Sequence, residues 1–473
     1  MRKPDLIVIG GGPAGAYAAL QAASCGLSVV MVDEQRLPGG QVWRAPATAG
    51  AKARPDDPDK RDGNILRDAL NVSAVTVISN AIVWSVEPGF KVSLLGDGPM
   101  TFEAPRLLAA TGASERVVPF EGWTLPGVLG LAAATAIMKA EANLPGQRIV
   151  LAGQGPLLVA VAAKALALGI RPIAIVDANG RGDWARAAFG FSKIPSLAVR
   201  GMGWQTRVRL AGVPIYRRHG VVEAEGEDAL KRVTIAPLDA DGRPAKGRRT
   251  TLDADILYVG NGLTPNTEVT RLLGAEHAID PLLGGVHPCC DGFGRTSLSG
   301  LYAAGDGAGI RGALPATLSG RLAAIAIAHD SGALDGSRFE RLTRPLVRRA
   351  KRAAQFADAS CALMAVSAER IDAIAPHTVV CRCEDVTRAT IDAAAKGGAL
   401  EINQLKQETR LGMGPCQGRF CSETAAALLG AHCGGRAKAG ILTARPPLRP
   451  LPIDTMCGTF TYDDIPVPKP APL

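Results

Sequence analysis

Two segments of the chain repeat one pattern of aliphatic strand, glycine-rich turn and alanine-rich helix, and this repetition limits the possible folds more than any other feature. The first copy, residues 5–35, reads DLIVIGGGPAGAYAALQAASCGLSVVMVDEQ, and the second, residues 148–178, reads RIVLAGQGPLLVAVAAKALALGIRPIAIVDA. A strand and helix that lead into a second strand form a βαβ unit of a parallel sheet. The sequence therefore predicts an α/β protein with two nucleotide-type folds.

The glycine turn of the first copy has the spacing of a dinucleotide-binding loop. Gly10 permits the tight turn, Gly12 lets the backbone approach a pyrophosphate, and Gly15 allows the helix to pack closely. The phosphates then meet the positive end of the helix dipole. Glu34 follows Gly15 by 19 residues, where a carboxylate can accept hydrogen bonds from a ribose. The predicted binding residues of this site are Gly10, Gly12, Pro13, Ala14, Gly15, Asp33 and Glu34.

The second copy keeps only part of this motif. Gly153 and Gly155 are present, but Leu158 replaces the third glycine, while Asp177 keeps the ribose offset of 19 residues. An acid at that position disfavours the 2′-phosphate of NADP. Two interpretations stay open: a bound NAD or other adenine nucleotide, or a fold that is structural or empty. Hydride exchange with free NADH is not well supported.

Four of the ten cysteines form two close pairs near the C-terminus. Cys381 and Cys383 make C-x-C, and Cys416 and Cys421 make C-x4-C. Four thiolates from two loops can complete the ligand shell of a [2Fe-2S] cluster, which we favour over a four-cysteine zinc site or unliganded thiols. The chain contains no CxxC motif, so reduction of disulfides is not its expected task. We assign no role to the six other cysteines or to the histidines.

The order of segments predicts several modules. Residues 1–115 and 250–330 would form a discontinuous domain around the first nucleotide site, with residues 116–249 as the second nucleotide fold. A basic helical linker would span residues 331–374, and the cysteine module residues 375–432, with two short helices around Gly397–Gly398. The proline-rich tail, residues 433–473, should lie extended on a surface from Ala444 onward.

Composition excludes several other classes of protein. The formal charge is +9, yet only 4% of residues are aromatic and no RNA-binding motif is present, so nucleic acid is not an expected partner. We expect no transmembrane segment and no signal peptide, which places the chain in the cytoplasm. The basic stretch from Arg341 to Arg352 is a solvated helix face or a docking face for an acidic partner.

Three further segments resemble the two-dinucleotide-binding flavoprotein superfamily of glutathione and thioredoxin reductases. They are PGGQ at residues 38–41, AATG at residues 109–112 and TSLSGLYAAGDG at residues 296–307. The resemblance implies a bound FAD, with the aspartate of the last segment on the ribityl chain. The flavin-binding residues implied here are Gly40, Gln41, Thr111, Gly112, Gly305 and Asp306.

The combination of both nucleotide folds with the cysteine pairs resembles a narrower family. It contains the α subunits of heteromeric opine oxidases, D-hydroxyproline or proline dehydrogenases and hydrogen cyanide synthase, and it is related to part of the sarcosine oxidase α subunit. The stretches CRCEDVT, NQLKQETRLGMGPCQGRFC and PPLRPLP carry this resemblance, and the cysteine module looks like the bacterioferritin-associated-ferredoxin type of [2Fe-2S] domain.

This narrower resemblance implies that the chain is an electron-transfer component of a larger enzyme. An amine or imino acid would be oxidised on the FAD of a separate β subunit. Some relatives hold FMN at the subunit interface, and a small ferredoxin-like γ subunit is a further candidate partner. Electrons could leave through an acceptor at the inner membrane. The chain shows no convincing catalytic constellation of its own. The alternatives are a self-sufficient NADH-dependent ferredoxin-type reductase and a zinc-containing nucleotide-binding scaffold.

Overall fold

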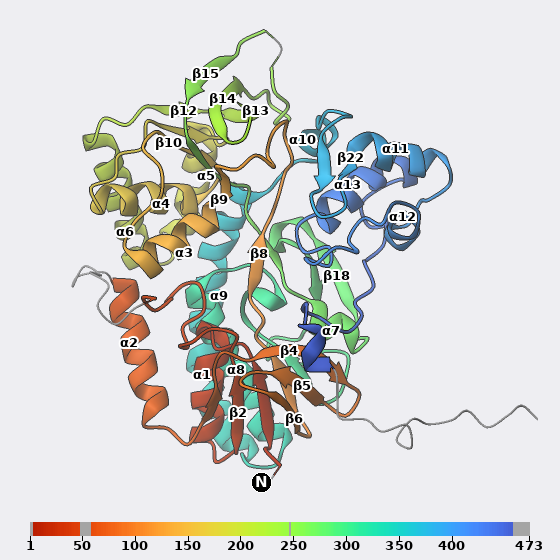
Figure 1. Ribbon diagram of the computed structural model, residues 1–473. Helices are drawn as coiled ribbons and strands as arrows, with labels where there is room; N and C mark the ends of the chain where they lie inside the picture. The colour runs from red at the N-terminus through yellow and green to blue at the C-terminus, as the bar shows by residue number, and fades with distance from the viewer. Residues whose placement is uncertain (1–2, 48–57, 246, 457–473) are drawn as a thin grey trace, which may run out of the picture.

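A parallel sheet forms the core of the N-terminal domain. The computed structural model describes residues 3–47, 58–245 and 247–456. The strand order is β20-β7-β1-β2-β3, and every pair is parallel. The strands are β1 (Leu6–Ile9), β2 (Val29–Val32), β3 (Thr76–Ile78), β7 (Leu107–Ala109) and β20 (Leu301–Ala303). Strand β20 therefore returns to this sheet after the second nucleotide fold has been completed (Figure 1).

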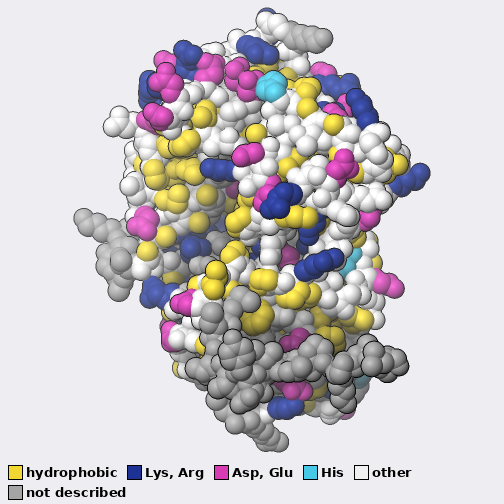
Figure 2. All heavy atoms as spheres, turned by 45° about the vertical axis from the view of Figure 1, so that its right-hand side comes forward, with side chains coloured by type: hydrophobic (Ala, Val, Ile, Leu, Met, Phe, Trp, Pro, Cys, Tyr) yellow, Lys and Arg dark blue, Asp and Glu magenta, His cyan; other side chains and the backbone are white. Residues whose placement is uncertain are grey.

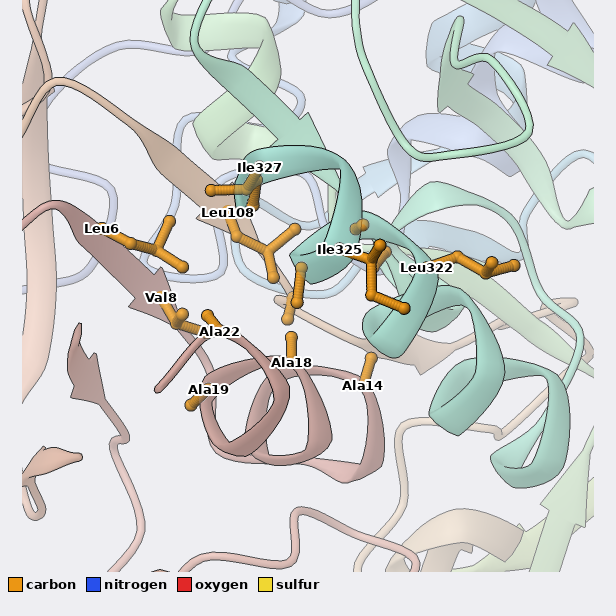
Figure 3. Packing of buried hydrophobic residues seen from close by; sticks show 14 of the residues in the cluster. Leu6, Val8, Ala14, Ala18, Ala19, Ala22, Leu108, Leu322, Ile325 and Ile327 are labelled. Atoms are coloured by element: carbon orange, nitrogen blue, oxygen red, sulfur yellow. The ribbon is translucent and has the colours of Figure 1, made fainter. Parts of the chain in front are cut away.

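Helices α1 (Pro13–Ser24) and α8 (Ala313–Asp330) pack closely against one another beside this sheet. Figure 3 shows Ala14 and Ala18 of α1 on the side of that helix that faces α8, with the larger side chain of Ile325 pointing toward them. Alanine on one helix lets the two backbones approach. At Gly320 a Cβ atom would lie 2.1 Å from the carbonyl oxygen of Ala14, so the glycine is needed for this approach.

The second nucleotide fold has its own parallel sheet, with strand order β12-β11-β10-β16-β9. Its strands are β9 (Val128–Gly130), β10 (Ile149–Gly153), β11 (Ala174–Asp177), β12 (Ile215–Arg217) and β16 (Ile256–Gly260). Its helices are α3 (Leu131–Glu141), α4 (Pro156–Ala167), α5 (Arg181–Phe191) and α6 (Pro195–Leu210). Strand β10 is buried at every residue, as expected for a strand covered on both faces.

Antiparallel strands accompany both folds. The first meander is β4 (Ile82–Glu87), β5 (Lys91–Leu95) and β6 (Pro99–Glu103), and the second is β13 (His219–Gly226), β14 (Leu230–Pro237) and β15 (Thr250–Asp253). The chain passes from the first nucleotide fold to the second through β8 (Ala113–Glu115) and returns through β17 (Leu263–Pro265), and these two strands pair in antiparallel orientation. After β17 come helix α7 (Glu268–Leu272) and a hairpin formed by β18 (His277–Asp280) and β19 (Gly285–Pro288). Helix α2 (Pro58–Asn71) lies between β2 and β3 in the sequence.

Helix α9 (Gly336–Met364) links the two nucleotide folds along its length, because it packs against α8 of one and α5 of the other (Figure 1). The side chain of Asp335 caps its N-terminus by accepting a hydrogen bond from the N–H of Arg338 at 2.7 Å. Its basic residues Arg341, Arg344 and Arg348 are exposed. Helix α10 (Ala368–Asp372) follows and leads into the C-terminal module.

The C-terminal module contains the cysteine pairs and has a separate hydrophobic core. Its elements are β21 (Val379–Cys381), β22 (Val386–Thr387), α11 (Arg388–Lys396), α12 (Ile402–Thr409) and α13 (Ser422–Cys433). Helices α11 and α12 confirm the two short helices predicted around Gly397–Gly398. Figure 2 brings this side of the molecule forward and shows acidic and basic side chains interspersed over its surface.

Residues 441–452 follow the module without helix or strand. Leu448 is buried in the core of the N-terminal domain, and its N–H donates to the carbonyl of Trp84 at 2.7 Å. The short helix η3 (Ile453–Met456) ends the described part. None of the helices in the described ranges combines the length and the apolar composition of a membrane-spanning segment.

Candidate functional site

The first glycine turn has the geometry of a phosphate-binding loop. Gly10 has a φ of +103°, and a Cβ atom there would lie 2.3 Å from the carbonyl oxygen of Ala110. At Gly15 a Cβ atom would lie 1.9 Å from the carbonyl oxygen of Gly10, so only glycine allows the helix to start this close to the strand. Gly12 is the N-cap of α1 and Pro13 its first residue, which leaves the helix N-terminus facing the loop.

The two acids that end β2 lie in different surroundings. Asp33 is only 5% exposed, and its Oδ2 atom is buried against the backbone of Gly11 without an aligned hydrogen bond to any residue that the structure describes. Burial raises the pKa of Asp33 to about 6. The side chain of Glu34 is half exposed and lies 3.8 Å from Arg449. The geometry therefore favours Asp33, rather than Glu34, as the acceptor for a ribose at this loop.

Segments distant in sequence meet beside the same loop. Gly40 has a φ of +57°, and a Cβ atom there would lie 2.9 Å from the Cα of Gly12. Gln41 is exposed and accepts a hydrogen bond from Arg44 at 2.9 Å. At Gly305 a Cβ atom would lie 2.6 Å from that of Ala14. The PGGQ and GDG segments are thus both brought to the N-terminal end of α1.

The segment with Thr111 and Gly112 lies next to the GDG turn. A Cβ atom at Gly307 would lie 2.7 Å from the Oγ1 of Thr111, whose hydroxyl donates to the carbonyl of Asn266 at 2.6 Å. Asp306 accepts hydrogen bonds from the N–H groups of Arg311 and Gly312, at 2.9 and 2.8 Å, so its carboxylate closes the turn before α8. Burial raises the pKa of Asp306.

The second glycine turn is covered by the chain itself. A Cβ atom at Gly155 would lie 2.5 Å from the Cγ of Met364, the last residue of α9. The amide of Gln154 donates to the carbonyl of Ala365 at 3.0 Å. Arg370 of α10 donates to the side-chain oxygens of Gln154 at 2.8 Å and of Asn261 at 2.9 Å. The link between α9 and α10 therefore lies where a pyrophosphate would approach this loop.

The carboxylate at the predicted ribose position of the second fold already accepts hydrogen bonds from the chain itself. The Oδ2 of Asp177 accepts from the indole N–H of Trp184 and from Arg217, each at 3.0 Å, and its Oδ1 accepts from the N–H of Asn179. Asp177 is 2% exposed. Gly153 has a φ of +134° and lies against Gly260. The fold of a nucleotide site is kept here, but its polar groups already bond to residues of the chain.

The four predicted cluster cysteines meet in the C-terminal module. The thiol of Cys421 lies beside those of Cys381 and Cys416, and the thiol of Cys416 lies beside that of Cys383. Hydrogen bonds from Cys421 and from backbone N–H groups lower the pKa of Cys381 to about 6 and that of Cys416 to about 5. Burial raises the pKa of Cys383, and the adjoining thiols of Cys381 and Cys416 raise that of Cys421. In the absence of metal, the two loops therefore favour the thiolate at Cys381 and Cys416 and the thiol at Cys383 and Cys421.

Glycines keep the second cysteine loop close to the first. A Cβ atom at Gly414 would lie 2.3 Å from the Cβ of Cys383, and Gly412 and Gly418 have φ values of +80° and +81°. The N–H groups of Gly412 and Gly418 lie near the sulfurs of Cys381 and Cys416, respectively, and lower the pKa of these thiols. Such donors and all-cysteine ligation are typical of iron–sulfur sites.

Both sites fit the groups that the sequence predicts. The buried Oδ2 of Asp33, beside a helix N-terminus that no side chain caps, suits the ribose and pyrophosphate of FAD. The four sulfurs suit a [2Fe-2S] cluster, which takes two thiolates on each iron. Around a single point, the described residues gather no three His, Cys, Asp or Glu side chains that could hold one metal ion.

Sequence reasoning missed several residues of these sites. Gly11, under Asp33, lies within the glycine run but outside the spaced motif. Arg370 and Met364 close the second loop from about 200 residues away, and no local pattern marks them. Glu115 on β8 is a buried carboxylate that accepts from the N–H of Ala132 at 3.0 Å, and burial raises its pKa to about 7.

Comparison with known proteins agrees with this geometry. Residues 4–332 match the pyridine nucleotide-disulphide oxidoreductase family, and residues 379–431 match the BFD-like [2Fe-2S] binding domain. These matches imply FAD and a [2Fe-2S] cluster as cofactors of the chain.

Two curated relatives match along almost their whole length. An opine oxidase subunit of Rhizobium meliloti is 35% identical, over 94% of this chain and 97% of the relative. Hydrogen cyanide synthase subunit HcnB of Pseudomonas aeruginosa is 32% identical over the same shares.

Among solved structures, L-proline dehydrogenase from P. horikoshii is similar in fold, with a TM-score of 0.69, 20% identity and coverage of 97% of this chain and 80% of that one. Thioredoxin reductase from T. acidophilum, with a TM-score of 0.53 and 20% identity, covers 70% of this chain and 99% of its own. The predicted two-dinucleotide-binding fold with a C-terminal [2Fe-2S] domain is thereby confirmed. The chain belongs to the pyridine nucleotide-disulphide oxidoreductase family, in the group that contains hydrogen cyanide synthase subunit HcnB and its opine oxidase counterpart.

Proposed function

We propose that this FAD and [2Fe-2S] oxidoreductase is the electron-transfer subunit of a heteromeric dehydrogenase. A partner β subunit with its own FAD would oxidise an amine or imino acid of the opine, D-hydroxyproline, proline or glycine type. Electrons would then pass through this chain to an acceptor. The relatives from opine oxidase and hydrogen cyanide synthase are named as subunits, which supports an assembly of several chains.

One structural observation carries the proposal: the cysteine module is fastened to the crossing between the two nucleotide folds. The hydroxyl of Thr424 on α13 donates to the carbonyl of Val117 at 2.6 Å, and the indole N–H of Trp123 donates to the carbonyl of Val379 at 2.7 Å. Val117 and Trp123 follow β8, which leads away from the Thr111 segment of the first site. This segment thus connects the surroundings of the two predicted cofactor sites.

This arrangement suits a relay. A bound flavin supplies exchange of two electrons with one partner and of single electrons with an iron–sulfur cluster. The residues of this chain would hold the adenosine end on α1, favour the thiolates of Cys381 and Cys416, and connect the two sites through the segment that follows β8. We expect no proton-abstracting residue for substrate in this chain, since that chemistry would lie on the β subunit.

Several finer parts of the proposal concern assembly. FMN at an interface with the β subunit remains a prediction, and so does a small ferredoxin-like γ subunit. The domain limits given above are predictions as well. The same holds for a cytoplasmic location and for transfer of electrons to an acceptor at the inner membrane. The exposed basic face of α9, with Arg341, Arg344, Arg348 and Arg352, is a candidate docking surface for an acidic partner. Assembly that weakens as salt is added would support such docking.

An NADH-dependent ferredoxin-type reductase is the main alternative, and the covered loop at Gly155 counts against it. A zinc-containing scaffold is the other. Copurification of the native complex, with mass spectrometry of its released cofactors and a dye-reduction screen over opines, prolines, sarcosine and glycine, tests the proposal. Substrate-dependent dye reduction that requires this chain supports it. Zinc without iron and acid-labile sulfide, or full turnover by the partner alone, would overturn it.

A further inference from the structure

A buried ion pair joins the cluster loop to the flavin-binding part of the molecule. Arg419 lies between the ligands Cys416 and Cys421, and its side chain is 11% exposed. Its Nε lies 2.5 Å from the Oε1 of Glu268 on α7, although the N–H is not aligned for a hydrogen bond. The side chain of Glu268 is 8% exposed. Two opposite charges are therefore held out of water at the loop that carries Cys416 and Cys421.

The guanidinium of Arg419 also holds two other segments. One nitrogen donates to the carbonyl of Cys416 at 3.1 Å, and another donates to the carbonyl of Leu448 at 2.7 Å. Leu448 is buried in the core of the N-terminal domain. A single side chain thus connects a cluster ligand, the proline-rich segment and α7, and its planar fork of donors suits such a junction better than a lysine would.

The pair lies among other charged side chains. A cavity of about 50 Å³ lies beside it and is lined by Arg271, Glu423 and Arg436 as well as by the pair itself. Glu423 and Arg436 bond to each other at 2.8 and 3.0 Å. Because the side chains of Arg419 and Glu268 are both largely buried, solvent screens their charges weakly.

We propose that Arg419 and Glu268 form a positioning pair that also sets the reduction potential of the cluster. Reduction adds one negative charge to the cluster, so the nearby cation of Arg419 stabilises the reduced form and raises the potential. The carboxylate of Glu268 offsets part of this effect. The inference rests on the [2Fe-2S] assignment alone. It can therefore fail while the proposed electron relay holds, and the relay can fail while the effect of the pair on the potential holds.

Redox titration of the full chain, followed by electron paramagnetic resonance of the cluster, tests this pair. Arg419→Gln should lower the potential, and Glu268→Gln should raise it, each by at least tenfold in the reduction equilibrium, which is about 59 mV for one electron. The double variant should return toward wild type. Arg410→Gln is the control, because Arg410 pairs with Glu384 at 2.8 Å in the same module but is 69% exposed.

Opposite shifts distinguish tuning from damage, since a loosened loop would move both variants in one direction. If Arg419→Gln loses its iron, Arg419→Lys keeps the charge and should hold a potential near wild type, while Glu268→Gln still gives the upward shift. Shifts of the same sign, or potentials equal to wild type in both single variants with full iron content, would overturn the proposal.

Discussion

The covered second loop leads to a quantitative prediction about nicotinamide nucleotides. A pyrophosphate could reach Gly155 only if the link between α9 and α10 moved away. That movement would break one neutral hydrogen bond, from Gln154 to Ala365, and two bonds from the buried Arg370. With about 1 kcal/mol for the neutral bond and about 2 kcal/mol for each charged one, opening costs about 5 kcal/mol. NADH affinity should therefore be lowered several thousandfold.

Calorimetry with NADH and anaerobic stopped-flow absorbance of the flavin measure this effect directly. We expect no micromolar binding and no flavin bleaching within turnover time, while dithionite reduces the same flavin. Arg370→Ala removes two of the three bonds, so residual NADH binding should tighten a hundredfold or more, since about 4 kcal/mol of the opening cost is lost. Arg344→Ala, on the exposed face of α9, should leave it unchanged.

Two results would refute this reasoning. Micromolar NADH binding with rapid flavin reduction by the wild-type chain would show that the link does not close the loop. Binding that is equally weak in Arg370→Ala and wild type, with the variant folded, would mean that Asp177 and its partners exclude the nucleotide instead.

Three further predictions concern the cluster, the core and the first site. Cys381→Ser and Cys416→Ser should each lose iron, acid-labile sulfide and the visible absorption of the cluster, because each removes one of its four thiolates. Gly320→Ala should lower the free energy of unfolding by about 1–3 kcal/mol in denaturant titration, since its Cβ would collide with the carbonyl oxygen of Ala14. Burial raises the pKa of Asp33 from 3.8 to about 6, so the flavin-free chain should lose up to about 3 kcal/mol of stability as pH rises through that window. FAD binding, which uses the ionised carboxylate as an acceptor, should tighten over the same window.

Matched variants separate these effects from general damage. Cys433→Ser should keep the cluster, and Gly292→Ala should keep its stability because a Cβ atom there meets nothing within 4 Å. Asp33→Asn should abolish the pH dependence of both stability and FAD affinity. Retained iron in Cys416→Ser, unchanged unfolding in Gly320→Ala, or an FAD affinity that weakens as pH rises from 3.8 to about 6 would contradict the respective prediction.

The local motifs could be predicted because each depends on neighbouring residues. The spacing of Gly10, Gly12 and Gly15 specifies a strand that turns into a helix, and the cysteine pairs specify two loops that can share ligands. The choice between Asp33 and Glu34 could not be made in this way, because the end of β2 decides which carboxylate turns toward Gly11. Adjacent residues of a strand point to opposite faces, so a shift of one position decides whether Asp33 or Glu34 faces Gly11.

The closure of the second loop could not be predicted at all. Met364 and Arg370 are ordinary residues near the end of a long basic helix and in the short helix after it, and only the packing of α9 against α5 and α8 brings them to Gly155 and Gln154. The same holds for Glu268, which meets Arg419 across two modules. Long-range contacts of this kind leave no periodic trace in the sequence.

The central claim is that electrons from a substrate-oxidising partner reach the cluster of this chain. Rapid-freeze electron paramagnetic resonance of the assembled complex, mixed anaerobically with its substrate, measures this transfer most directly. The account predicts that the signal of the reduced [2Fe-2S] cluster develops within the turnover time, and that it is absent when this chain carries Cys416→Ser. A cluster that stays oxidised while the complex turns over at its full rate would contradict the account.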